Sequence, residues 1–195
     1  MSTSALNVWF WRRMATWATL LGRDATALEY AERIAAARPD DPKALASLAH
    51  RRAGAGGRNE AIALLERAVA LDGSQAGAWY NLGYLLQEAQ RHDEAIAAFD
   101  RALAIDEKLD LAHYGKAISL VKTDRLEEAI APLERNIALQ PMSPFGFYQL
   151  AHVHHRLGRR AQVAKLIRRL SGFEPAVATR LERETGVRRD EPAPG

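Results

Sequence analysis

A fixed internal period of 34 residues constrains the fold more than any other feature of this 195-residue chain. Small residues recur at this interval, at Ala15, Ala49, Gly83, Ala117 and Ala151. A second register reads Ala27, Ala61, Ala95, Ala129 and Val163. A third register reads Pro39, Gly73, Glu107, Pro141 and Pro175. All of these except Glu107 are helix breakers. A period of this length indicates one supersecondary unit that is repeated and stacked on its neighbours.

Apolar residues within each period follow helical spacing, as in Trp79, Leu82 and Leu86 of the third period. A second helical pattern follows in the same period, so we expect two helices per unit. A glycine in the middle of a helix costs about 1 kcal/mol relative to alanine. We therefore expect Gly83 and Ala95 to mark a close crossing of the two helices of the third unit.

Polar residues that can cap helices stand near the expected helix starts. Asp41 and Ser143 each precede a proline, and Asn59 and Asp93 stand at the starts of second helices. A side-chain oxygen at such a position accepts a hydrogen bond from an unpaired N–H group of the first turn. All four residues are therefore predicted to act as N-caps.

The third unit resembles a tetratricopeptide repeat. The family pattern is Trp-x2-Leu-Gly-x2-Tyr, followed by Ala-x3-Phe-x2-Ala and a proline near the end. The residues that match it are Trp79, Leu82, Gly83, Ala95, Phe99 and Ala102. Leu86 replaces the Tyr of the pattern and Glu107 its proline; in later units His113 replaces the Trp, Lys116 the Leu and His154 the Tyr.

The resemblance covers five tandem repeats, which we place at residues 8–41, 42–75, 76–109, 110–143 and 144–177. It implies an all-α fold, a right-handed α-solenoid of helix-turn-helix repeats. Residues 1–7 form an N-terminal lead-in. A helix that begins at Pro175 carries Val177 and Leu181 one turn apart and is expected to cap the array, with 178–186 as the end of this capping helix. Residues 187–195 are predicted to be a disordered tail.

The resemblance also implies a concave groove, lined by the first helices, that binds a peptide segment or helix of a partner protein. Two positions of each unit are expected to line it. The predicted peptide-groove residues are Tyr80, Asn81, Tyr84, Tyr114, Tyr148 and His152, flanked by the basic residues Lys43 and Arg156. Three tyrosines in consecutive units could form a ladder of rigid amphipathic contacts. The family's clamp for a C-terminal carboxylate is disfavoured, because Ala46 and His50 precede Asn81 and Gly115 and Ile118 follow it.

The first helix carries large apolar residues on one stripe, at Phe10, Met14, Trp17 and Leu21. The first unit has no preceding repeat to cover them, so we expect a self-association or partner edge there. Two alternatives stay open. The helix could fold back or fray, or it could insert into a membrane surface through Trp9, Trp11 and Trp17 beside Arg12 and Arg13.

Several function classes are disfavoured by what the sequence lacks. It contains no cysteine, no His-Glu-x-x-His, no phosphate-binding Gly-Lys-Ser/Thr loop and no Gly-x-Ser-x-Gly elbow, so we expect no enzyme activity, no cofactor and no metal site. Ten basic residues lie between Arg156 and Arg189, but Phe173 is the only aromatic residue among them, which makes nucleic acid a disfavoured partner. Membrane association is likewise disfavoured, and the expected location is the cytoplasm.

These features together predict a non-catalytic scaffold for protein–protein interaction. Its partner is expected to be a protein or peptide held in the concave groove. The alternative function is a small chaperone or assembly factor that acts as a homodimer through its N-terminal aromatic helix.

Overall fold

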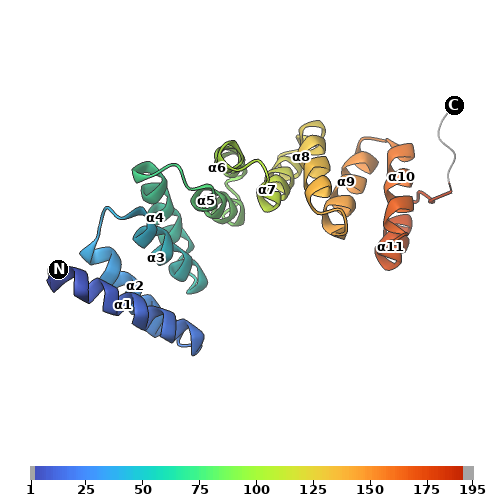
Figure 1. Cartoon of the computed structure of the whole chain (residues 1–195). Helices are drawn as coiled ribbons and strands as arrows, with labels where there is room; N and C mark the ends of the chain where they lie inside the picture. The colour runs from blue at the N-terminus through green and yellow to red at the C-terminus, as the bar shows by residue number, and fades with distance from the viewer. Residues whose placement is uncertain (1–2, 191–195) are drawn as a thin grey trace. The chain divides into compact units, whose positions relative to one another are not determined.

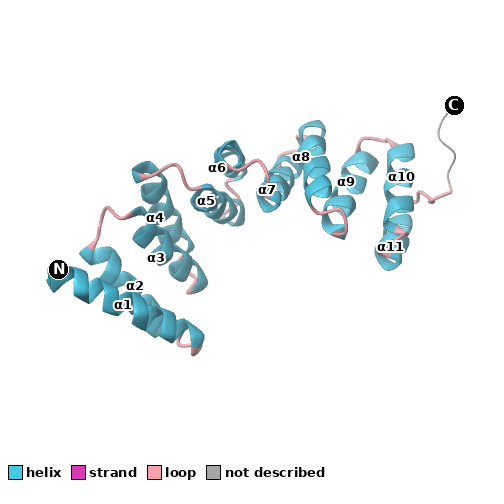
Figure 2. Ribbon diagram, in the orientation of Figure 1, coloured by secondary structure: helices cyan, strands magenta, loops and turns pink. Residues whose placement is uncertain are grey.

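The computed structural model describes residues 3–190, and every regular element within that range is an α-helix (Figure 2). The chain divides into two compact units, Met1–Arg91 and His92–Gly195. Each unit is described by itself below. The predicted all-α class is confirmed.

The described part of the first unit, residues 3–91, contains five helices (Figure 1). Their bounds are α1 Thr3–Leu20, α2 Asp24–Ala37, α3 Pro42–Gly54, α4 Arg58–Leu71 and α5 Ala76–Glu88. Helix α1 packs on α2 and α3 packs on α4, so that each pair forms a helical hairpin, and α2 and α4 each also pack on the helix that follows.

The second unit contains the remaining helices, which stack in the same manner. Their bounds are α6 His92–Ile105, α7 Asp110–Lys122, α8 Leu126–Leu139, α9 Pro144–Arg156, α10 Arg160–Leu170 and α11 Pro175–Thr185. Helix α11 packs on both α9 and α10, as expected of a capping helix.

The helix starts repeat the period of the sequence. Helices α3, α5, α7 and α9 begin at residues 42, 76, 110 and 144, and α2, α4, α6, α8 and α10 begin at residues 24, 58, 92, 126 and 160. Both series advance by 34 residues. The turns between the paired helices repeat in the same way, because one residue in each has a positive φ, at Gly22, Gly56, Gln90, Asp124 and Gly158.

Both registers of small residues are buried. Ala49, Ala117 and Ala151 of the first register are fully buried, and Val163 and the alanines of the second register from Ala27 to Ala129 are fully buried as well. A core cluster of the second unit runs from Ile96 to Val187 and includes residues of α11. The period therefore specifies which side chains face the interior.

At both ends of the described chain, the structure differs in detail from the bounds expected from the sequence. Helix α1 begins at Thr3, so it extends into the segment 1–7 that we expected to be a lead-in. Val187 is fully buried, and Arg189 donates hydrogen bonds to Glu182 from its backbone N and from its guanidinium. Residues 187–190 are therefore packed against α11 rather than disordered, because an apolar side chain and an ion pair hold them. Residues 191–195 lie outside the described part.

Only one of the four predicted caps is confirmed. The Oδ1 atom of Asp41 accepts hydrogen bonds from the backbone N atoms of Lys43 and Ala44, at 3.0 and 3.3 Å. Ser143 occupies the N-cap position of α9 without a side-chain cap bond. Asn59 and Asp93 each lie one residue inside their helix, since α4 begins at Arg58 and α6 at His92. The prediction was wrong there because the second helices begin earlier than the loops suggested.

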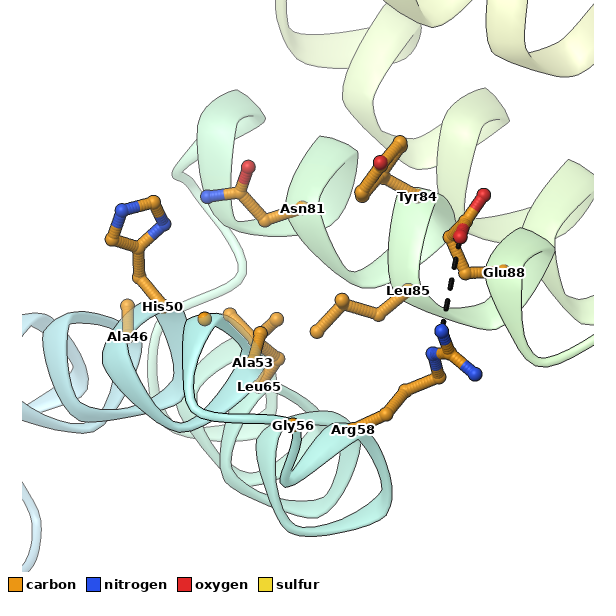
Figure 3. A pocket seen from close by; sticks show the side chains of 11 residues that line it. Ala46, His50, Ala53, Gly56, Arg58, Leu65, Asn81, Tyr84, Leu85 and Glu88 are labelled. Atoms are coloured by element: carbon orange, nitrogen blue, oxygen red, sulfur yellow. Dashed lines mark ion pairs between the residues drawn. The ribbon is translucent and has the colours of Figure 1, made fainter.

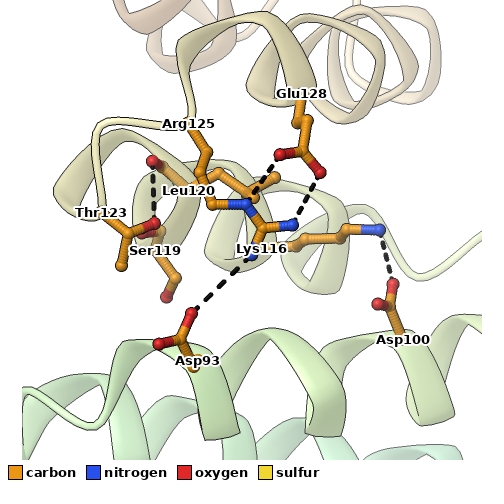
Figure 4. A network of polar contacts seen from close by, with 8 residues as sticks. All are labelled: Asp93, Asp100, Lys116, Ser119, Leu120, Thr123, Arg125 and Glu128. Carbon is orange, nitrogen blue, oxygen red and sulfur yellow. Dashed lines mark hydrogen bonds and ion pairs between the residues drawn. The ribbon is translucent and has the colours of Figure 1, made fainter.

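Polar side chains tie α6 to the two helices that follow it in the second unit (Figure 4). Lys116 Nζ donates to Asp100 Oδ1 at 2.5 Å. Arg125 forms a bidentate pair with Glu128 at 2.6 and 2.7 Å and lies 3.7 Å from Asp93. Thr123 Oγ1 bonds the carbonyl of Ser119 and so closes the end of α7. Thr123 and Arg125 flank Asp124, the residue with a positive φ in the turn between α7 and α8.

Candidate functional site

The first unit has a pocket of about 360 Å³ between α3, α4 and α5 (Figure 3). Its lining consists of Ala46, His50, Ala53, Gly54, Gly56, Arg58, Leu65, Asn81, Tyr84, Leu85 and Glu88. Helix α3 contributes one wall and α5 the facing wall. Because Ala46, Ala53 and Gly54 carry little or no side chain, the wall on α3 leaves room above the core.

The pocket combines an apolar floor with a polar rim. Leu65 and Leu85 belong to the buried core of the first unit and form the floor, with exposed fractions of 1% and 8%. His50, Asn81 and Tyr84 lie at the rim and are exposed (Figure 3). Such a combination is typical of sites that hold an apolar group and orient it with a few hydrogen bonds.

The rim contains polar groups that the protein does not use itself. Within residues 3–190, the side chains of His50, Asn81 and Tyr84 make no hydrogen bond or ion pair. The amide of Asn81 has two donors and an acceptor, which match the C=O and N–H groups of a peptide backbone. At one end of the pocket, Arg58 and Glu88 lie 3.8 Å apart.

A second hollow of about 540 Å³ shares His50 and Gly54 with this pocket. It lies towards the turn between α1 and α2, and its other lining residues are Thr19, Asp24, Ala25, Leu28, Arg51 and Ala55. The depression in the first unit is therefore longer than one pocket. We refer to both hollows together as the unit-1 groove.

The other predicted groove residues of the first unit lie outside this pocket lining. Tyr80 is half-buried on α5. Lys43 is exposed in the first turn of α3, next to the capping carboxylate of Asp41. Asn81 and Tyr84 are thus the two predicted residues that the structure brings together in the pocket.

The predicted residues of α9 contact the capping helix instead. The Tyr148 hydroxyl donates to Glu184 Oε2 at 2.7 Å, and His152 Nε2 lies 3.1 Å from the same oxygen. Arg180 donates to the other oxygen of Glu184 at 2.7 Å. These donors, Arg180 first and then Tyr148, lower the pKa of Glu184 to about 2, whereas burial and the bond to Glu184 raise the pKa of Tyr148. The carboxylate of Glu184, a residue of the same chain, therefore already occupies the polar surface beside Tyr148 and His152.

Tyr114 and Arg156 are also engaged within the second unit. Tyr114 is half-buried and packs against the core. Arg156 donates to Asp124 in the turn before α8. Its charge is therefore paired with an acidic group of the same unit.

Sequence reasoning missed three groups that shape these surfaces. Arg58 and Glu88 close one end of the pocket, and Glu184 fills the position beside Tyr148 and His152. Glu88 lies one period after Gly54 in the sequence, so the period could have indicated that both face the same side. The spacing of Val177 and Leu181 predicted α11 but not the direction in which its polar residues point.

The predicted partner edge on α1 is exposed. Phe10, Trp17 and Leu21 have exposed fractions of 49%, 55% and 63%, and Met14 is half-buried. None of these residues lines the unit-1 groove. The groove and the edge are separate surfaces of the first unit.

Part of the basic block of the second unit is engaged by contacts within the unit. Arg159 lies 3.8 Å from Glu127, Arg160 donates to the carbonyl of Gly186, and Arg180 and Arg189 pair with Glu184 and Glu182. Fewer cations therefore remain for a phosphate backbone than the count of basic residues suggests.

Among residues 3–190, no three His, Asp or Glu side chains gather as metal ligands would. No described helix is long and apolar enough to cross a lipid bilayer.

Comparisons with known proteins agree with the repeat architecture. The tetratricopeptide repeat family model matches residues 76–109, the third predicted unit. No curated protein matches the sequence. Among solved structures, the chain is similar to MamA, with 21% identity, a TM-score of 0.78, and coverage of 97% of this chain and 98% of that chain.

Two further structures show the same fold. A MamA fragment from Desulfovibrio magneticus RS-1 is 18% identical, with a TM-score of 0.78 and coverage of 91% of this chain and 96% of that chain. YrrB, described as a TPR protein with an unusual peptide-binding site, is 16% identical, with a TM-score of 0.76 and coverage of 87% and 88%. The family model thus identifies residues 76–109 as a tetratricopeptide repeat, and the structural similarities, together with the period of the helices, show that the chain shares the fold of these repeat proteins.

Proposed function

We propose that the protein is a non-catalytic scaffold that binds an extended peptide segment of a partner protein in the unit-1 groove. One observation carries this proposal. His50, Asn81 and Tyr84 surround an apolar floor, and the protein engages none of their polar groups within residues 3–190. Polar groups placed around an apolar hollow are suited to orient a ligand backbone while an apolar side chain fills the hollow.

The bound peptide would place one apolar side chain on Leu65 and Leu85. The pocket volume of about 360 Å³ accommodates a leucine-sized or aromatic side chain. The Asn81 amide would then pair with the peptide backbone, and the Tyr84 ring would cover the anchor from one side. Because Arg58 and Glu88 neutralise one another at the end of the pocket, we expect no strong preference for a charged anchor.

The equivalent face of α9 is a weaker candidate for the same role. Glu184 already accepts the hydrogen bond of Tyr148 and contacts His152. A ligand there would have to displace a carboxylate that three side chains stabilise. The first unit, in which the side chains of His50, Asn81 and Tyr84 make no hydrogen bond or ion pair within residues 3–190, is therefore the better site.

Selection of peptides from a random displayed library against the wild-type protein tests the proposal. The affinity of a selected peptide is then measured by fluorescence anisotropy for the wild type and for Asn81→Ala combined with Tyr84→Ala. We expect the combined change to weaken binding at least about tenfold, since it removes a backbone contact and an aromatic contact. Asn59→Ala is the matched control, because Asn59 is an exposed helical asparagine outside this pocket, and it should leave the affinity within about twofold.

Circular dichroism shows whether both variants remain folded. Selected peptides that share an apolar anchor and lose affinity only with the combined change support the groove. A folded double variant that binds the selected peptides as tightly as the wild type overturns the proposal.

The homodimeric chaperone or assembly factor remains the competing proposal for the first unit. Its support is the exposed apolar face of α1. That face shares no residue with the peptide pocket, so changes in one surface can be tested without altering the other.

A further inference from the structure

We propose that the outer face of α1 docks on an anionic lipid surface. This face is defined by Leu6, Trp9, Phe10, Trp17, Leu20 and Leu21, whose exposed fractions range from 49% to 73%. Half of the twelve large exposed apolar residues in the described part of the chain lie here. We call this surface the α1 face. It is separate from the groove that carries the proposed peptide-binding function.

The α1 face is presented outward because the opposite side of the helix is already packed. Val8, Ala15 and Ala18 are buried, and α1 packs on α2 along its length (Figure 1). The corresponding helix α5 has only Tyr84 as an exposed large apolar residue. The concentration of apolar surface is thus a property of α1 and not of the first helices in general.

Charge favours an anionic surface over a neutral one. Residues 1–23 contain three arginines and no acidic residue. Arg12 is paired with Asp41 at 3.3 Å, whereas Arg13 and Arg23 form no ion pair within residues 3–190. Basic residues beside an apolar helix face strengthen binding to anionic lipids.

The position of Arg13 distinguishes a lipid surface from a second copy of the chain. Arg13 lies one helical turn from both Trp9 and Trp17, inside the apolar face, and its guanidinium carbon is 5.6 Å from the Trp9 ring centroid. At a bilayer interface, an arginine extends along the apolar surface and places its charge among the lipid phosphates. Tryptophan rings also concentrate at that depth.

A two-fold contact between two α1 faces would be less favourable. The face runs from residue 6 to residue 21, so Arg13 lies near its midpoint. In an antiparallel isologous contact, residues near the midpoint meet their own copies. Two guanidinium groups would then approach one another where neither helix supplies an acidic residue.

Vesicle binding of the full chain tests the proposal. Phosphatidylcholine vesicles are compared with vesicles in which about one-third of the lipid is phosphatidylglycerol, a typical anionic lipid. Three of the four tryptophans lie on α1, so tryptophan emission reports its environment along with sedimentation. We expect binding and a blue shift with the anionic vesicles, weaker binding to the neutral vesicles, and loss of part of the affinity as ionic strength rises.

Three variants identify the surface. Phe10→Asp combined with Trp17→Asp should weaken binding to anionic vesicles at least about tenfold. Arg13→Glu should reduce the preference for anionic over neutral vesicles. Phe145→Asp is the matched control, because Phe145 is 67% exposed on α9 in the second unit, and its replacement should leave binding unchanged.

The proposal is overturned if the wild type binds neither kind of vesicle, or if the folded double variant binds as well as the wild type. Equal binding to both kinds of vesicle overturns the choice of an anionic surface. A dimer seen by light scattering that the double change abolishes, without any vesicle binding, assigns the α1 face to a second copy. None of these outcomes affects peptide binding in the unit-1 groove, so the two proposals fail independently.

Discussion

Trp79 and His113 lie one period apart and make equivalent hydrogen bonds. Trp79 Nε1 donates to the carbonyl of Gly73 at 3.0 Å, and His113 Nε2 lies 3.0 Å from the carbonyl of Glu107. Gly73 and Glu107 are themselves one period apart. A carbonyl oxygen only accepts hydrogen bonds, so His113 carries its proton on Nε2. This shared bond explains how a histidine replaces the tryptophan of the repeat pattern in the fourth unit.

Replacement of His113 by a residue that cannot make this hydrogen bond should therefore destabilise the fold. We expect His113→Phe to lower the free energy of unfolding by about 1 kcal/mol, because the ring remains but its hydrogen bond is lost. Urea unfolding followed by circular dichroism measures the change. His155→Phe is the control, since His155 is exposed on α9 and should leave stability within about 0.5 kcal/mol. Equal stability of the two variants would show that the bond contributes nothing.

Gly115 is required by its contact with α6. A Cβ atom at this position would lie 2.5 Å from Cζ of Phe99, whose side chain is fully buried, so the ring would have to shift within a packed core. Alanine gains up to about 1 kcal/mol in helix propensity, but overpacking a core costs about 1–3 kcal/mol. We expect Gly115→Ala to be destabilising by about 1–2 kcal/mol, measured by urea unfolding.

Two companion variants separate the contact from the backbone effect. Gly77→Ala in α5 meets no atom within 4 Å, so it should stabilise the protein. Phe99→Leu should relieve the clash, so Gly115→Ala should cost less in that background than in the wild type. An unchanged cost in both backgrounds would contradict the assignment to Phe99.

Lys116 occupies a position that holds leucine in other repeats. Leu48, Leu82 and Leu150 are buried at this register, whereas Lys116 is half-buried and bonds Asp100 (Figure 4). A partly exposed ion pair contributes about 0–1 kcal/mol, and added apolar burial contributes a comparable or larger amount. We expect Lys116→Leu to raise the melting temperature. Lys122→Leu on the same helix is the control, because Lys122 is exposed and its replacement buries no comparable area.

The 34-residue period explains which features of the structure could be predicted from the sequence. Residues such as Ala49, Ala117 and Ala129 were placed correctly because stacking repeats bury the same register in every unit. The caps at Asn59 and Asp93 were misplaced, since one residue of shift at a helix start changes the role of a side chain without altering the apolar pattern. The engagement of Tyr148 by Glu184 was not predicted, because it depends on how α11 is rotated about its axis. The 34-residue period determines which side chains are buried, whereas the polar contacts between repeats depend on the local geometry of each helix.

His154 should make the second unit sensitive to mild acid. It replaces the leucines found one and two periods earlier, Leu120 and Leu86, and its Nδ1 is buried without a hydrogen-bond partner. Burial, and then the nearby Arg159, lower the pKa of His154 from its usual value of 6.5. At mildly acidic pH, His154 therefore binds a proton more readily in the unfolded chain than in the folded chain. The free energy of unfolding should decrease as the pH drops through 6.5.

His154→Leu should remove this pH dependence, because leucine has no proton to bind. Urea unfolding at several pH values between neutrality and mild acid measures it. His155→Leu is the control, since it removes an exposed histidine from the same helix and should leave the slope intact. An unchanged slope with His154→Leu would assign the sensitivity to another group.

Glu184 should control a second loss of stability at lower pH. Hydrogen bonds from Arg180 and Tyr148 lower its pKa to about 2, against 4.5 for an unperturbed glutamate. Its carboxylate therefore stabilises the folded state fully above pH 4.5, and that contribution is lost as pH falls from 4.5 towards 2. Glu184→Gln and Tyr148→Phe should each flatten the fall in stability over this range. Glu29→Gln removes an equal charge from the first unit, where Glu29 forms no ion pair within residues 3–190, and should leave the profile unchanged. A fall that persists with Glu184→Gln would instead point to Glu182, whose pKa is also lowered to about 2 by Arg189.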